Sequence, residues 1–129
     1  MRAIKSSWEL DSLRHAGAKL SEVFASVPDF LQPGMREVDL AAEFEARLRK
    51  AGGEGYIRMR AFNQELFMGL VIAGDSGGGG GFFDGAVTGR GMSDASPHGA
   101  SRMVIEENQS MLLDYVGVFD GYCIDMTRM

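Results

Sequence analysis

The sequence has one cysteine, three prolines and one tryptophan among its 129 residues. A single cysteine, Cys123, excludes an internal disulfide, so a disulfide-stapled fold is ruled out. No run approaches the roughly 18–20 consecutive apolar residues of a membrane-spanning helix, and the first residues lack the apolar segment of a signal peptide. We therefore expect a cytoplasmic protein without a membrane-embedded part.

Basic side chains are scarce in the second half of the chain. The net charge is −5, and residues 61–129 hold three basic and nine acidic side chains, against ten and nine in residues 1–60. An acidic half without a basic stripe argues against nucleic acid as the partner and is compatible with a cation site. Solvated carboxylates explain the same charge equally well.

Composition and length favour one globular domain over residues 1–129. Hydrophobic residues make up 45% of the chain and charged residues 24%, which is typical of globular proteins. A chain of this length can build a core but cannot form two full domains. Six of the 18 glycines lie between residues 74 and 81. We expect a flexible loop there.

Two helices are predicted in the first half. Ser6 and Glu9 have the spacing of a capping box, and apolar residues then recur every three or four positions until Pro28. A second helix is predicted over 37–51, ended by two glycines. Its expected inner side consists of Val38, Ala41, Ala42, Phe44, Glu45 and Leu48.

Strands are predicted in the second half. Alternating residues 56–60 and the apolar run 66–73 are typical of strands, and irregular structure is expected from there to about residue 109. Residues 111–128 predict a hairpin whose turn is Asp120-Gly121, because Asp-Gly is a strong hairpin signal. The order of two helices followed by antiparallel strands predicts an α+β fold.

The predicted turn also determines which residues of the two hairpin strands lie opposite each other. A two-residue turn at Asp120-Gly121 places Asp125 opposite Val116 and Asp114 opposite Thr127. Asp114 and Asp125 are then diagonal neighbours on one sheet face, close enough to share a cation. Carboxylates inside apolar strands are costly unless they are paired or coordinated, which favours a metal site. An exposed sheet face that tolerates aspartate fits the spacing equally well.

Several motifs together resemble a known family. The segment 114–128, DYVGVFDGYCIDMTR, is similar to the metal-binding hairpin of the pita-bread metallopeptidases, in its spacing of the two aspartates and its Asp-x-Thr-Arg ending. Further similarity lies in residues 4–9, 13–17, 33–35 and 97–99. The sequence most resembles the Xaa-Pro aminopeptidase and prolidase branch, whose relatives include methionine aminopeptidase and creatinase. The expected fold is half of a pita-bread domain.

The resemblance implies a site with two divalent metal ions, which are manganese, cobalt, zinc or iron in this family. Asp114 matches the aspartate that chelates one ion, and Asp125 matches the aspartate that bridges both. His98 matches a histidine that lies near the substrate and can hydrogen-bond the reacting carbonyl. The implied reaction is hydrolysis of a peptide bond before proline by a hydroxide between the metals. Without the resemblance, a surface-loop histidine is the preferred interpretation of His98.

The sequence also departs from the family. It ends four residues after Asp125, before the region that supplies the family's ligand histidine and two ligand glutamates. His15, on the first helix, is not expected to replace that histidine. Two carboxylates alone hold a transition metal weakly. We therefore expect the 129-residue chain to lack three of five ligands and to be inactive by itself.

Two alternatives to a peptidase fragment stay open. One is a non-catalytic half-domain that serves folding or interaction, and the other is a fragment of a creatinase-like amidinohydrolase. The expected partners are a peptide with proline at its second position and a second copy of this chain. A homodimer would cover the surface that the other half covers in the family.

Overall fold

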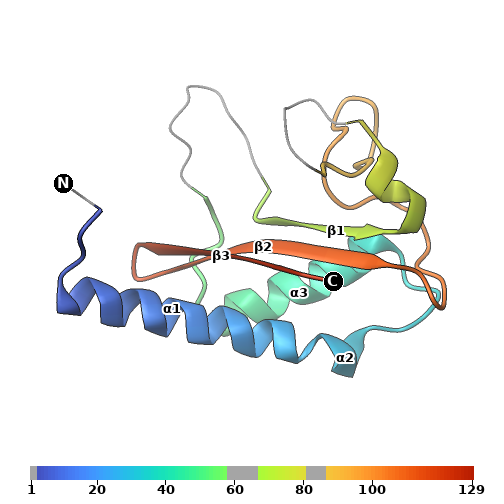
Figure 1. Ribbon diagram of the computed structural model, residues 1–129. Coiled ribbons are helices and arrows are strands. Elements are labelled where there is room, and N and C mark those ends of the chain that lie inside the picture. Colours follow the sequence, from blue (N-terminus) through green and yellow to red (C-terminus); the bar gives the residue numbers. More distant parts are fainter. Residues whose placement is uncertain (1–2, 58–66, 81–86) are drawn as a thin grey trace.

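The computed structural model of the chain describes residues 3–57, 67–80 and 87–129. The three α-helices lie along one side of a three-stranded antiparallel sheet (Figure 1). The elements in chain order are α1 (Ser7–Ala25), α2 (Val27–Phe30), α3 (Glu37–Lys50), β1 (Gly69–Ala73), the 3-10 helix η1 (Gly74–Gly78), β2 (Met111–Phe119) and β3 (Tyr122–Arg128). The predicted α+β class is confirmed, since helices precede an antiparallel sheet.

The predicted capping box begins α1. The Ser6 hydroxyl accepts a hydrogen bond from the Glu9 amide, and the Glu9 carboxylate accepts one from the Ser6 amide at 2.7 Å. The helix ends at Ala25, and the short helix α2 follows, which the sequence analysis did not predict. Pro28 lies in the first turn of α2, where a missing amide proton costs no helical hydrogen bond. The proline therefore starts a helix as well as closing one.

The second predicted helix is confirmed as α3, but the prediction of which residues lie on its inner face was partly wrong. Leu40 and Glu37 are fully buried, whereas Ala42 is exposed. Phe44 and Leu48 are buried as expected. The buried positions follow one stripe of the helix at steps of three and four residues, and Ala42 lies off that stripe.

The hairpin register is confirmed. β2 pairs with β3 so that Asp114 lies opposite Thr127 and Asp125 lies opposite Val116. Asp120 and Gly121 both have positive φ, at 49° and 77°, as a type I′ turn requires. β1 pairs with the other edge of β2, so the sheet order is β1-β2-β3.

The glycine-rich segment differs from the expectation of an irregular loop. Residues 74–78 form η1, and Ser76 within it is fully buried. Ser76 donates a hydrogen bond to Glu37 on α3. This bond orders a segment for which the glycine-rich composition alone predicts a flexible loop. Residue 81 lies outside the described residues, as does most of the strand predicted over 56–60.

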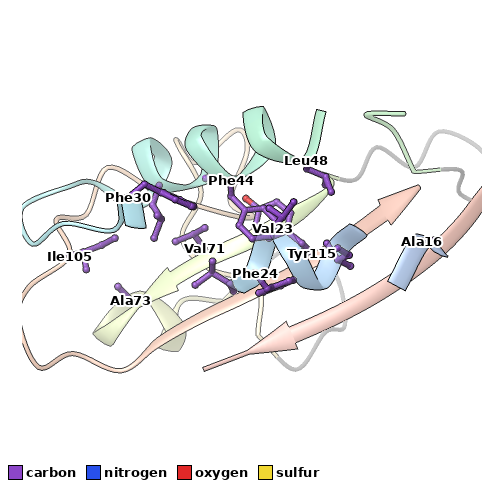
Figure 2. Packing of buried hydrophobic residues seen from close by; sticks show 14 of the residues in the cluster. Ala16, Val23, Phe24, Phe30, Phe44, Leu48, Val71, Ala73, Ile105 and Tyr115 are labelled. Atoms are coloured by element: carbon purple, nitrogen blue, oxygen red, sulfur yellow. The ribbon is translucent and has the colours of Figure 1, made fainter. Parts of the chain in front are cut away.

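The core lies between the helices and the sheet (Figure 2). Phe44 stacks on Tyr115 of β2 with ring centroids 4.2 Å apart, and Phe24 of α1 meets Phe44 edge-on at 4.9 Å. Leu113 and Tyr115 from β2 belong to this core, and Ile124 and Met126 of β3 pack against it. Because side chains alternate along a strand, the residues between them point away from the helices.

In the described part of the chain, no helix combines the length and the apolar character that crossing a membrane requires.

Candidate metal centre

The two predicted metal ligands lie on the sheet face that is turned away from the helices. Asp114 is flanked on β2 by the core residues Leu113 and Tyr115, and Asp125 is flanked on β3 by residues that pack against the core. Both aspartates line one pocket of about 150 Å³. The other residues of this pocket are Ile57, Phe67, Met68, Gly69, Leu70, His98 and Val116. The hairpin thus brings the two carboxylates together, as predicted.

The electrostatics of this pocket favour a cation. The pKa of Asp125 is raised, first by partial burial and then by the negative charge of Asp114. A positive ion between two carboxylates would remove the repulsion that raises this pKa. Thr127 donates a hydrogen bond from its hydroxyl to Asp114 Oδ1 at 2.6 Å and so fixes that carboxylate.

His98 reaches the same pocket from the irregular segment between η1 and β2. His98 is only 3% exposed, so the interpretation as a surface-loop histidine is wrong. The imidazole stacks on Phe67 at 5.6 Å between centroids with planes 15° apart. Burial lowers the pKa of His98, which keeps the ring neutral near pH 7. A neutral imidazole has one donor and one acceptor nitrogen.

The backbone next to His98 suits only glycine. Gly99 has φ at +84°, and a Cβ there would lie 3.2 Å from the Phe67 ring. The Gly99 amide donates to the Thr88 carbonyl at 2.7 Å. The His98-Gly99 pair therefore lets the chain turn while the imidazole stays against Phe67.

The donor set fits part of a divalent-metal site. Carboxylate oxygens are hard ligands that suit divalent cations such as manganese. Within residues 3–57, 67–80 and 87–129, no group of three or more His, Cys, Asp or Glu side chains could hold a metal ion. His15 is exposed on α1 and is not among the residues of the aspartate pocket. The structure thus brings together two carboxylates and one histidine near them.

A second pocket adjoins the first and was not predicted. It has a volume of about 200 Å³ and shares Phe67, Gly69 and His98 with the aspartate pocket. Its remaining lining comes from α3 and from the irregular segment between η1 and β2, through Val38, Ala41, Ala42, Glu45, Met92 and Ala100. Burial raises the pKa of Glu45, although a hydrogen bond from Tyr115 opposes this effect.

Sequence reasoning missed two residues that support the site. The role of Thr127 could have been found, because the predicted register already places it opposite Asp114. Phe67 had no such signal, since its contact with His98 joins residues 31 positions apart across irregular segments. Its place beside the imidazole depends on tertiary packing.

Comparison with known proteins relates this arrangement to peptidases. Probable dipeptidase PepE from Mycobacterium tuberculosis is 31% identical over 99% of this chain, which matches 28% of that protein. The uncharacterized peptidase YqhT from Bacillus subtilis is 28% identical, over 99% of this chain and 29% of that protein. The chain thus spans less than a third of the length of these relatives.

Solved structures show the same relationship. The X-Pro aminopeptidase from Thermotoga maritima superimposes with a TM-score of 0.70 at 26% identity, over 99% of this chain and 29% of that one. The Xaa-Pro dipeptidase from Bacillus anthracis gives a TM-score of 0.68 at 28% identity, over 98% and 29%. These neighbours confirm the predicted pita-bread relationship. Residues 11–129 match metallopeptidase family M24, and the chain belongs to that family.

Proposed function

We propose that this chain supplies one part of the metal site of an Xaa-Pro aminopeptidase or dipeptidase. One observation carries the proposal: Asp114, Asp125 and His98 line a single pocket although they come from three different segments. The similar proteins named as Xaa-Pro peptidases support the substrate class. The substrate would be a peptide with proline at its second position.

Asp114 and Asp125 are the residues that would hold two divalent metal ions, of which manganese is one candidate. When bound, such ions activate water and polarise the scissile carbonyl. Thr127 would keep the Asp114 carboxylate oriented, because its hydroxyl already donates to Oδ1. The two aspartates therefore determine where the reacting carbonyl lies.

His98 would bind the substrate from the side of Phe67. Its lowered pKa favours a neutral ring, whose N–H can donate a hydrogen bond to the carbonyl oxygen as negative charge develops there. Stacking on Phe67 limits rotation of the imidazole and excludes water from one of its faces. His98 thus acts as a hydrogen-bond donor and not as a metal ligand.

The 129-residue chain by itself is proposed to be inactive. Two carboxylates are fewer than the five ligands that the family resemblance implies, and the described residues contain no larger ligand group. Such a site would hold a transition metal weakly.

We place the protein in the cytoplasm, which its single cysteine supports.

We also propose that the chain forms a homodimer. The helices cover one face of the sheet, and within the described residues β3 is an edge strand with one neighbour, β2. An unpaired strand edge is a template for pairing with another chain. Light scattering behind size exclusion at micromolar concentration should give twice 14.0 kDa, and a purely monomeric mass would refute the dimer.

Peptide binding tests the proposed function. The chain is titrated in Zn²⁺, which is diamagnetic and does not broaden NMR signals, with a dipeptide that ends in proline and, separately, with the same dipeptide ending in alanine. NMR should show a change at the His98 imidazole with the proline peptide only, while His15, exposed on α1, stays unchanged. Equal responses to both peptides, or none, would contradict the Xaa-Pro assignment. Release of free proline by the chain alone would contradict its inactivity.

A further inference from the structure

Glu37 is a fully buried carboxylate that the proposed reaction does not use. Its Oε1 accepts a hydrogen bond from the Ala73 amide at 2.7 Å. Its Oε2 accepts three more, from the Ser76 hydroxyl at 3.1 Å, the Ser101 amide at 2.8 Å and the Ser101 hydroxyl at 2.6 Å. Four donors match the acceptor capacity of an ionised carboxylate. Its position in the first turn of α3 also favours negative charge.

These hydrogen bonds connect segments that lie far apart in the sequence. Ala73 ends β1, Ser76 belongs to η1, and Ser101 lies three residues after His98. A backbone hydrogen bond runs beside them, from the Val38 amide to the Ser101 carbonyl at 3.0 Å. One side chain on α3 thus links β1 to the segment that carries His98.

The same link reaches the aspartate pocket. β1 pairs with β2 so that Leu70 lies directly opposite Asp114. A shift of the segment around Ser101 relative to β1 would therefore move His98 relative to Asp114. Buried hydrogen bonds to a charged group are strong, and a buried donor left without a partner is costly, so this link resists such a shift.

We propose that Glu37 is a positioning residue that acts through Ser101 to hold His98 against the aspartate pocket. The importance of His98 in that position rests on the proposed function. The effect of Glu37 on the placement of His98 can be measured whether or not the proposed function is correct. In Glu37→Gln the amide group presents donors where the carboxylate presents acceptors, so at least one of the four hydrogen bonds is lost.

The two histidines of the chain provide the readout. NMR spectra of the metal-free chain contain imidazole signals from His98, which is stacked on Phe67, and from His15, which is exposed on α1. Assignment follows from a His15→Gln variant. In Glu37→Gln and in Ser101→Ala, the His98 signals should move toward those of a solvent-exposed histidine while the His15 signals stay in place.

Two control variants separate positioning from a general loss of stability. Ser76→Ala removes a hydrogen bond from the same carboxylate on the η1 side, and it should leave the His98 signals unchanged. Leu48→Ala creates a core cavity and lowers stability, yet it should also leave them unchanged.

The proposal is overturned if the His98 signals stay in place in a folded Glu37→Gln or in Ser101→Ala, or if Ser76→Ala or Leu48→Ala moves them as much. Should Glu37→Gln fail to fold, Ser101→Ala decides the question. The NMR experiment uses neither metal nor peptide. Its result therefore tests the placement of His98 even if the proposed peptidase function is wrong.

Discussion

Thr127 donates a hydrogen bond from its hydroxyl to the Asp114 carboxylate, with 2.6 Å between the two oxygens, across the β2–β3 pair. The bond links the two strands that carry the proposed metal ligands. It also leaves the second oxygen of Asp114 available to a cation. In the proposed site, Thr127 would therefore orient the carboxylate of Asp114 without binding the metal itself.

Removal of this hydroxyl should weaken metal binding. Thr127→Val keeps the shape of the side chain but leaves Asp114 free to rotate, and partners of metal ligands typically contribute roughly tenfold or more in affinity. Calorimetric titration with Mn²⁺ measures the change. Thr127→Ser, which retains the hydroxyl, should bind nearly as the parent chain does. Equal affinity in the valine variant would show that the hydrogen bond does not orient Asp114 for a metal.

The capping box at Ser6 should contribute to stability. In Ser6→Ala the Glu9 amide loses its acceptor, and loss of such a cap costs about 1 kcal/mol of unfolding free energy. Urea unfolding followed by circular dichroism measures this loss. Ser12→Ala is the matched control, because the Ser12 hydroxyl only donates back to the Trp8 carbonyl within α1. Equal stability of Ser6→Ala and the parent chain would contradict the role of the cap.

Glu45 should make the stability of the chain depend on pH. Burial raises the pKa of Glu45 in the folded state, so between the unfolded value and this raised value the folded chain binds more protons. The free energy of unfolding therefore falls as pH rises through that window, and the loss persists at higher pH. Glu45→Gln has no ionisable group at this position, so it lacks this contribution to the pH dependence.

The measurement compares the two chains at several pH values. Urea midpoints taken from pH 4 to pH 7 should show the parent chain losing stability relative to Glu45→Gln as pH rises. The glutamine can still accept the hydrogen bond from the Tyr115 hydroxyl, which spans 3.4 Å in the parent chain. A constant difference between the two chains over this range would contradict a raised pKa at Glu45.

The sequence was most informative where structure is local. The capping box at Ser6 and the Asp120-Gly121 turn each depend on a few neighbouring residues, and both are confirmed. Once the turn was placed, the pairing of Asp114 with Thr127 followed from the two-residue period of a strand.

The sequence was least informative where a residue depends on distant partners. Glu37 looks like an ordinary acidic residue in a first helical turn, and its burial arises from Ala73, Ser76 and Ser101. The same network orders η1, whose glycine content favoured an irregular loop. Neither contact leaves a local pattern in the sequence.

The central claim is that Asp114 and Asp125 together hold a divalent cation, and one titration tests it most directly. The 129-residue chain and its Asp125→Asn variant are titrated with Mn²⁺ by calorimetry under identical conditions. The account predicts saturable binding by the parent chain that the substitution abolishes. No binding by the parent chain, or the same binding by both, would contradict it.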